Sequence, residues 1–279
     1  EVGSGDPVSD FADIEEELNM WYHKILEGNR DKLKKITESD NDPVNALTEL
    51  YQGLGVKKNH VKEALKITKL EEKDIENYDI HDSKKFSTEL RRISKPTLIV
   101  ANKIDVKGAG KNFQRLRERY NDMIVVPASA DSELSLRRAE QKELIKYSPG
   151  SEQFDILKAN DLNQKQRDAL DFIKSDIMGE FMHTGVQFAI NVTVFKLLKM
   201  NSIYPVAIPE KLSDKNGRVL PDLILLKDGS TIVDLAKEIH SDLIKGLLYA
   251  KDLRYNLRVP TNYQLRDRDV ISLVSASKK

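Results

Sequence analysis

An amide, an ammonium group and a carboxylate stand close together at Asn102, Lys103 and Asp105, directly after the apolar run 98–101. Such a run is typical of a buried parallel strand, and doubly wound sheets bind their ligands beyond the carboxyl ends of these strands. Asp105 can accept hydrogen bonds from guanine N1–H and from its exocyclic amino group, a pair that adenine does not offer. Asn102 can bridge the loop backbone and the base, while the stem of Lys103 can lie over the ring. The pattern predicts a guanine site, with a solvated Asn/Asp turn as the alternative.

A small Ser-Ala pair, Ser129 and Ala130, follows the next predicted strand, residues 123–126. A predicted helix over residues 111–120 separates the two strands, and this order is typical of a doubly wound α/β sheet. The backbone N–H of Ala130 can then donate to guanine O6, and the small side chains let the backbone approach the base. The pair means little alone, but its place one strand–helix–strand unit after Asn102 makes it a candidate part of the same site.

Groups that would hold nucleotide phosphates are absent from the sequence. No segment has the Gly-x-x-x-x-Gly-Lys-Ser/Thr pattern of a phosphate loop. The segment 108–111 is partly similar, but Asp105 stands where the first glycine is required, and we interpret the segment as a flexible turn. Loose Asp-x-x-Gly matches at 105–108 and 176–179 overlap the base-binding motif and a predicted helix. We therefore expect no nucleotide hydrolysis by this chain alone.

No other set of side chains in the sequence indicates catalysis or metal binding. There is no cysteine, and the five histidines lack ligand spacing. Basic and aromatic residues do interleave near the C-terminal end, where they can grip RNA. Nearby Asp242 and Asp252 leave a solvated face as an equal alternative. The basic and aromatic residues are Lys245, Tyr249, Lys251, Arg254, Tyr255 and Arg258.

The composition is that of a globular protein with a heavily charged surface. The 279 residues allow two modest domains, or three if one is an insertion. Lys and Arg together number 45, as do Asp and Glu, so any contact with nucleic-acid phosphates must be local. No apolar run is long enough to cross a bilayer. We expect a cytoplasmic monomer with no membrane contact.

Residues 8–92 are predicted to be helical and charged. Apolar residues recur at helical spacing over 11–25 with Asp10 as a candidate cap, and Asp42 opens another helix. Short amphipathic helices with long polar faces indicate a helical hairpin or a coiled-coil arm. We assign residues 10–90 to this helical arm.

The rest of the chain is predicted to change from an α/β to an α+β pattern near Met200. Helices are expected over 134–146, over 163–182 and from Thr184 to Leu197. Beyond Met200, one helix lies among four short strands, an arrangement that suggests a β-grasp module. The expected strands are 204–208, 223–226, 247–250 and 270–274, and the helix is 232–239.

The order of these motifs closely resembles the archaeal YchF-type GTPases of the Obg-like group, with a C-terminal TGS domain. The resemblance covers nearly the whole chain, and its TGS block is the most specific part. It rests on Asp6-Pro7-Val8, Lys95-Pro96, residues 102–105 and 127–130, Tyr204-Pro205-Val206, Leu220-Pro221, Asp228-Gly229-Ser230-Thr231, Asp234-Leu235-Ala236 and residues 239–243.

The resemblance implies a partial P-loop GTPase domain formed by residues 1–9 and 91–200, the helical insertion, and a TGS domain over 201–279. In that family a phosphate loop and both switches come before the point where this sequence starts, so we expect a part of a longer protein. GTP or GDP is the implied ligand, with Mg²⁺ only where that preceding segment is present. Because Asn102, Lys103 and Asp105 are intact, the implied base is guanine rather than adenine.

Two functions stay open at this stage. The first is guanine-nucleotide binding by an Obg-like, translation-associated GTPase that hydrolyses GTP as the intact protein. The alternative is a module that binds RNA or the ribosome through the helical arm and the TGS domain, without nucleotide hydrolysis. A role of the arm as a protein–protein lever is a third, weaker reading.

Overall fold

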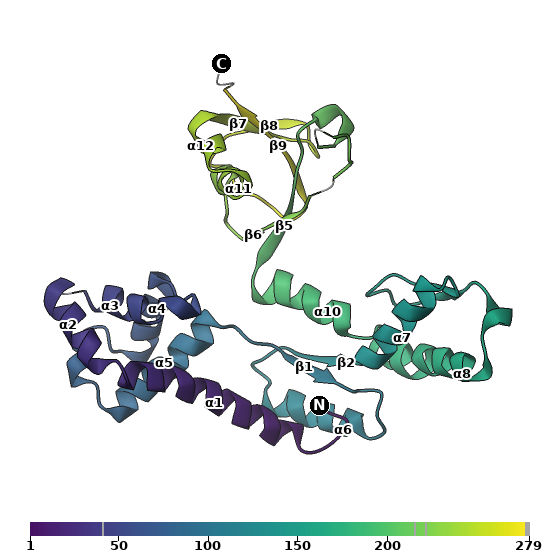
Figure 1. The fold of residues 1–279 in the computed structure, drawn as a ribbon, viewed down its shortest axis with the longest axis horizontal. Helices are drawn as coiled ribbons and strands as arrows, with labels where there is room; N and C mark the ends of the chain where they lie inside the picture. Colours follow the sequence, from purple (N-terminus) through teal and green to yellow (C-terminus); the bar gives the residue numbers. More distant parts are fainter. Residues whose placement is uncertain (41, 215, 221, 277–279) are drawn as a thin grey trace. The chain divides into compact units, whose positions relative to one another are not determined.

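The chain divides into two units, residues 1–189 and 190–279, in a computed structural model that describes residues 1–40, 42–214, 216–220 and 222–276 (Figure 1). Pro221, which contributes to the resemblance given above, lies outside the described residues. Unit 1 contains the helical arm and the α/β part with the candidate guanine site. Unit 2 is an α+β module. No helix of the described chain is both long enough and apolar enough to span a membrane.

The helical arm is a small bundle with its own core, in which α1 and α5 pack side by side (Figure 1). The core contains Tyr22 and Leu26 of α1 and Phe86 and Leu90 of α5, each at most 1% exposed. The helices are α1 (Pro7–Glu27), α2 (Arg30–Asp40), α3 (Pro43–Leu50), α4 (Lys58–Thr68) and α5 (Ile80–Ser94).

The predicted helix starts in the arm were partly right. Asp42 caps α3, as expected, and its carboxylate accepts a hydrogen bond from the N–H of Val44. The prediction for Asp10 was wrong, because α1 starts four residues earlier, with Asp6 as its cap and Pro7 in its first turn. Proline favours the first helical position since its missing N–H needs no partner there.

A buried arginine joins the two long helices of the arm. Arg91 of α5 is 5% exposed, and its guanidinium donates to Glu15 (2.8 Å) and to Asn19 (2.9 Å) of α1. A buried guanidinium is tolerated when its charge is paired and its N–H groups are bonded. This contact therefore fixes how α1 and α5 meet.

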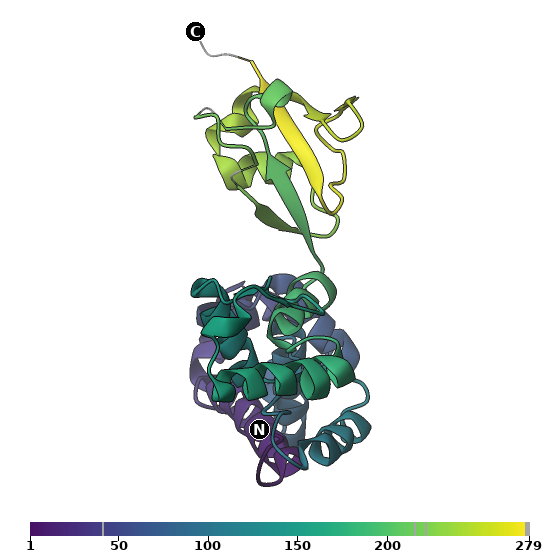
Figure 2. The same ribbon diagram turned by 90° about the vertical axis from the view of Figure 1, so that its right-hand side faces the viewer.

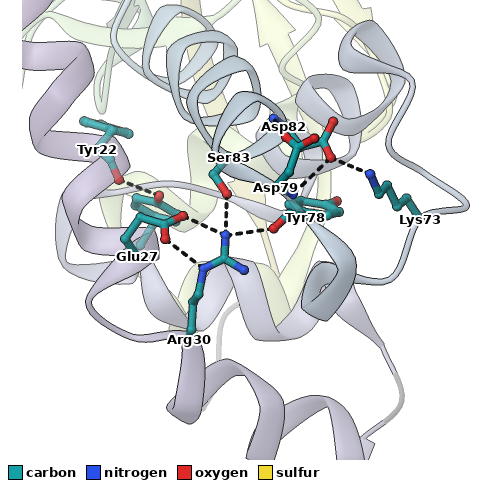
Figure 3. Close-up of polar contacts among 9 residues, drawn as sticks. Tyr22, Glu27, Arg30, Lys73, Tyr78, Asp79, Asp82 and Ser83 are labelled. Atoms are coloured by element: carbon teal, nitrogen blue, oxygen red, sulfur yellow. Dashed lines mark hydrogen bonds and ion pairs between the residues drawn. The ribbon is translucent and has the colours of Figure 1, made fainter.

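A second arginine, Arg30 at the start of α2, ties the α1–α2 turn to the start of α5 (Figure 3). It binds both carboxylate oxygens of Glu27 at 2.8 Å. One of its amino groups also donates to the Tyr78 carbonyl (3.0 Å) and to the Ser83 hydroxyl (2.8 Å). The hydrogen bond from Arg30 lowers the pKa of Glu27 below its usual value. Charge-assisted, two-pronged contacts of this kind specify geometry as well as energy.

The α/β part contains the predicted strand–helix–strand unit: β1 (Ile99–Asn102), α6 (Ala109–Arg119) and β2 (Val125–Ala128). The two strands are parallel neighbours, and one face of β1 packs through Ile99 and Ala101 against α6. The prediction of a fully buried strand was wrong at Val100, which is 46% exposed. Alternate residues of a strand point to opposite faces, and α6 covers only one of them.

The segment after β2 differs from its prediction. The helix expected over 134–146 is α7, Ala130–Gln141, and it ends where Glu143 takes a positive φ of 56°. Residues expected to be its last turn form β3 (Ile145–Lys146), which pairs with β4 (Asp155–Ile156). The start was missed because Ser129, read only as a base-contacting residue, caps α7.

The helix expected over 163–182 is present but is not a regular α-helix throughout. It runs as α8 (Gln164–Phe172), a π-helical segment (Ile173–Met178) and α9 (Gly179–Phe181). Asn163 caps α8 in a reciprocal capping box with Gln166. The next helix, expected from Thr184 to Leu197, consists of α10 (Val186–Asn191) and a second π-helical segment.

Unit 2 is a five-stranded mixed sheet with strand order β6-β5-β9-β7-β8 and a helix, α11, packed on it. The central strand β9 and its neighbour β5 are parallel and lie side by side (Figure 2). Its core contains Ile203, Ile232, Leu235 and Ile271, all 0% exposed. The elements are β5 (Met200–Pro205), β6 (Ile224–Lys227), α11 (Ile232–Ile239), α12 (Asp242–Gly246), β7 (Leu247–Asp252), β8 (Leu257–Val259) and β9 (Asp269–Ser275).

The predicted β-grasp pattern is confirmed, with local differences. The helix α11 has the predicted bounds, and Thr231 and Asp234 form a capping box at its start. The first strand begins at Met200 rather than at Tyr204. The short elements β8 and α12 were not predicted, since three to five residues carry too little periodicity to be recognised.

We predict that Arg30→Met lowers the free energy of unfolding of the arm by about 1–3 kcal/mol, because the Tyr78 carbonyl and the buried Ser83 hydroxyl lose a charged donor. Urea denaturation followed by the fluorescence of Trp21, the sole tryptophan of the sequence, measures this change in the arm itself. The control is Lys32→Met. Lys32 makes a surface ion pair with Glu49 in which both side chains are more than half exposed, and its loss should cost about 0.5 kcal/mol or less. Equal losses in both variants would contradict the assignment.

Candidate functional site

The pairing register of β1 and β2 brings the two predicted base-binding segments to one edge of the sheet. Asn102, the last residue of β1, lies opposite Ala128, the last residue of β2. Beyond the strands, the N–H of Ile104 donates to the carbonyl of Ala128 (3.1 Å). The loop after β1 and the loop after β2 are therefore held side by side.

A side chain of the first loop reaches the second. The Asn102 side-chain oxygen accepts a hydrogen bond from the backbone N–H of Ala130 at 3.1 Å. This is the bridge to the loop backbone that the residue type suggested. In this structure the N–H of Ala130, expected to face guanine O6, is directed to the side-chain oxygen of Asn102, and the amide nitrogen of Asn102 is a second group that can donate to a base.

Lys103 and Asp105 occupy the turn that follows β1. Lys103 has a positive φ of 67°, and its ammonium forms an exposed ion pair with Glu1 at 2.6 Å. The ion pair lowers the pKa of Glu1. Ile104 is 7% exposed and anchors the turn in the core, while Asp105 is half-buried beside it. The turn is therefore rigidly attached on one side and presents both charged residues on the other.

The N-terminal residues support this turn, a role that sequence reasoning missed. The N–H of Val2 donates to the carbonyl of Asn102 (3.0 Å), and the Val2 carbonyl accepts from the Asn112 side chain (3.0 Å). A Cβ at Gly3 would lie 3.1 Å from the Cβ of Lys103, so the backbone approaches closely there. Val2 is buried, but a single apolar residue among Glu1, Gly3, Ser4 and Gly5 forms no periodic pattern that would reveal this from the sequence.

The glycine-rich segment 108–111 starts a helix rather than forming the predicted flexible turn. Gly108 has a φ of 88° and caps α6, and Ala109 is the first residue of that helix. No acidic residue occupies the first turn of α6. The segment connects the loop that carries Asp105 directly to a well-packed element.

Ser129 is buried, and its side chain is used within α7. Its hydroxyl accepts a hydrogen bond from the N–H of Ser132 at 3.1 Å and lies 2.8 Å from the Ser132 hydroxyl. Its backbone N–H donates to the carbonyl of Thr184 at 2.8 Å. Ser129 therefore shapes the loop through its cap and its backbone.

A buried carboxylate, Glu133, lies one helical turn beyond Ser129 and was not singled out from the sequence. One of its oxygens accepts from Thr184 Oγ1 (2.5 Å) and from the Tyr147 hydroxyl (2.7 Å). The other accepts from Arg137 (2.5 Å). Burial is the strongest influence and raises the pKa of Glu133, but the hydrogen bonds from Thr184, Tyr147 and Arg137 together bring it below its usual value. Burial and the bond to Glu133 raise the pKa of Tyr147 to about 12.

The site offers groups for a base but no set of metal ligands. Among the described residues, no three His, Asp or Glu side chains are grouped so that they could hold an ion. We assign no step to a metal.

Two family descriptions match adjoining parts of the chain. Residues 100–207 match the domain described as Obg-like GTPase YGR210-like, G4 motif-containing domain. Residues 213–275 match the TGS domain.

Whole-chain similarity extends to three GTP-binding proteins. The uncharacterized GTP-binding protein MJ1332 of Methanocaldococcus jannaschii is 39% identical over 273 residues, which cover 98% of this chain and 68% of the relative. The uncharacterized GTP-binding protein C428.15 of Schizosaccharomyces pombe is 27% identical over 237 residues, or 81% of this chain and 57% of that protein. The crystal structure of a GTP binding protein from Pyrococcus horikoshii OT3 matches with a TM-score of 0.79 and 36% identity, covering 97% of this chain and 72% of that one.

We predict that Gly185→Ala destabilises unit 1 by about 3 kcal/mol or more, because a Cβ there would lie 2.0 Å from the carbonyl oxygen of Pro127. The matched control is Gly108→Ala. Gly108 has the same positive φ, but nothing lies within 4 Å of its Cβ position, so about 1 kcal/mol is expected. Thermal and urea unfolding of both variants measure the difference. Equal destabilisation would show that the contact with Pro127 is not tight.

Proposed function

The chain belongs to the Obg-like, YchF-type family of GTP-binding proteins with a C-terminal TGS domain, and we propose that its α/β part selects guanine through Asp105, Asn102 and Lys103. Asp105 accepts from N1–H and from the exocyclic amino group of the base. Asn102 holds the second loop and donates to the ring, and the stem of Lys103 covers one ring face. Ala130 forms the opposite wall, where its N–H is shared with guanine O6, and the buried Ser129 shapes this loop from behind.

The hydrogen bond between Asn102 and the Ala130 N–H is the observation that carries this proposal. It joins two loops that are 28 residues apart in sequence, beyond the carboxyl ends of adjacent parallel strands, where ligands of such sheets bind. A solvated turn that only ended β1 would need no such link. The half-buried Asp105 lies three residues after Asn102, in the turn that follows β1.

We also propose that the intact protein binds and hydrolyses GTP with Mg²⁺. This activity requires groups that hold the phosphates in addition to the base site. No phosphate-loop motif occurs in the sequence. The chain by itself should therefore bind guanine nucleotides weakly and should not hydrolyse them. A cytoplasmic, translation-associated role of a monomer is part of the same proposal.

A second candidate function is RNA or ribosome binding through unit 2, and one observation favours it. Lys251 of β7 and Arg258 of β8 are directly opposed across the antiparallel pair, and both are exposed. Like charges directly opposite each other destabilise a sheet unless an anion lies between or over them. Arg258 also stacks over the ring of Tyr249, 3.8 Å from its centre, which gives a flat cationic surface. Such a surface fits an RNA backbone and its bases.

We predict that Asp105→Ala weakens GDP binding by the intact protein about 100-fold, since two hydrogen bonds to a charged acceptor are lost. Asp105→Asn should shift the preference toward xanthine nucleotides, because an amide can donate to the carbonyl that xanthine carries at C2. Equilibrium binding of fluorescent guanine and xanthine nucleotides measures both effects.

The control for this experiment is Asp122→Ala, which removes an exposed aspartate from the turn after α6. It should leave affinity unchanged. If Asp105→Ala keeps its fold and full GDP affinity, the guanine site is not here.

We predict that the double variant Lys251→Ala and Arg258→Ala lowers RNA affinity at 50 mM salt by at least tenfold and reduces the slope of log K against log[salt] by about 1–2. Filter binding over a salt series measures the slope. The control is Lys211→Ala with Lys227→Ala, which removes the same charge elsewhere in unit 2. Equal effects of the two pairs would mean that binding follows net charge rather than the β7–β8 surface.

A further inference from the structure

The buried contacts around Glu133 enclose the residue that precedes Ala130. Ser129 donates its N–H to the Thr184 carbonyl, and its own carbonyl accepts from the N–H of Glu133 at 3.1 Å. Thr184 and Glu133 are in turn joined by the 2.5 Å hydrogen bond between their side chains. The N–H and the carbonyl of Ser129 are thus both hydrogen-bonded, and these bonds form a closed ring with Thr184 and Glu133.

Thr184 can accept the N–H of Ser129 because the backbone at residues 184–185 passes very close to the end of β2. The neighbouring Gly185 has a φ of 87°, and its Cβ position is 2.0 Å from the Pro127 carbonyl oxygen and 2.7 Å from the Cα of Ala128. Thr184 itself is 1% exposed. The backbone at 184–185 is therefore held against the strand end from which the second base-binding loop departs.

The carboxylate of Glu133 is a costly group to bury for packing alone. Its residue is 4% exposed, and three side chains donate hydrogen bonds to it. An apolar side chain of similar volume would stabilise such a position as well or better. A charged acceptor is instead suited to fixing the position and direction of its donors, and Thr184 is the donor that touches the loop.

We propose that Glu133 and Thr184 are positioning residues for guanine selection, and that they set the place of the Ala130 N–H between Asn102 and O6 of the base. The proposal rests on the proposed guanine site. The Glu133–Thr184 bond fixes Thr184, Thr184 fixes Ser129, and the N–H of Ala130 is one peptide bond away. Neither residue touches the nucleotide.

Base analogues separate this role from that of Asp105. The 6-thioguanine base keeps N1–H and the amino group but replaces O6 with a weakly accepting sulfur, so it probes the Ala130 side. Hypoxanthine keeps O6 and N1–H but lacks the amino group, so it probes Asp105. The two measured quantities are the ratios of Kd for 6-thio-GDP to GDP and for IDP to GDP, in the intact protein.

Two isosteric variants provide the comparison. Thr184→Val and Tyr147→Phe each remove one hydroxyl donor from the same oxygen of Glu133, but only Thr184 contacts the loop. In Thr184→Val and in Glu133→Gln the 6-thio-GDP to GDP ratio should fall about fivefold or more, while the IDP to GDP ratio stays constant. Tyr147→Phe should change neither ratio. Thr184→Ser keeps the hydroxyl, so its 6-thio-GDP to GDP ratio should equal that of the native protein. A general loss of stability would move neither ratio selectively.

Hydrogen exchange of the Ala130 amide gives a readout that needs no nucleotide. Thr184→Val should lower its protection about tenfold relative to the native protein, and Tyr147→Phe should not. Unchanged protection and unchanged ratios in Thr184→Val would overturn the positioning role. A third outcome separates the two proposals: protection falls in Thr184→Val, but Asp105→Ala keeps full GDP affinity. The hydrogen-bond ring then holds the loop, but the proposed guanine site is incorrect. That result overturns the role of Glu133 and Thr184 in base selection.

Discussion

The in-register parallel pairing of β1 and β2 is the constraint on which the candidate site depends. Parallel strands end at the same edge of their sheet, so residues that follow them become neighbours whatever their distance in sequence. Here each strand has four residues, and the end of one lies opposite the end of the other. A slip of one residue would turn Asn102 to the opposite face and separate it from Ala130. Two contacts oppose such a slip. Gly185 lies close to Pro127 of β2, and the N–H of Val2 donates to the carbonyl of Asn102 at the end of β1.

Buried charges occur at two joints of unit 1 where alignment matters more than stability. Arg91 aligns α5 with α1, and Glu133 aligns α7 with the segment at Thr184. Both charges are bonded by several partners, and each would be costly if one partner were removed. The same chemistry therefore supports the arm and the loop after β2, although their apolar cores share no residue.

A single helix, α1, connects the turn of the candidate site with the helical arm. The N-terminal residues pack on the turn at Lys103, and α1 begins at Pro7, four residues after Gly3. Near its start, α1 contacts α6 through Phe11 and Tyr120, and near its end Tyr22 and Leu26 enter the core of the arm. At 1.5 Å per residue its 21 residues span about 30 Å. A shift of the turn at Lys103 would therefore have a stiff route to the arm.

The sequence by itself determined the candidate chemistry of this protein and the order of its elements. Asn102 and Asp105 after an apolar run predicted the strand end, Asp42 predicted a helix start, and the alternation of patterns predicted an α/β part followed by a β-grasp module. These are local properties, set by side-chain type and periodicity over a few residues. The tertiary structure decided what depends on distant contacts: the burial of Glu133, the support from Val2, the exposure of Val100 and the close approach of Gly185 to Pro127. Hydrogen bonds between residues 50 or 100 positions apart leave no periodic trace, so only the folded chain reveals them.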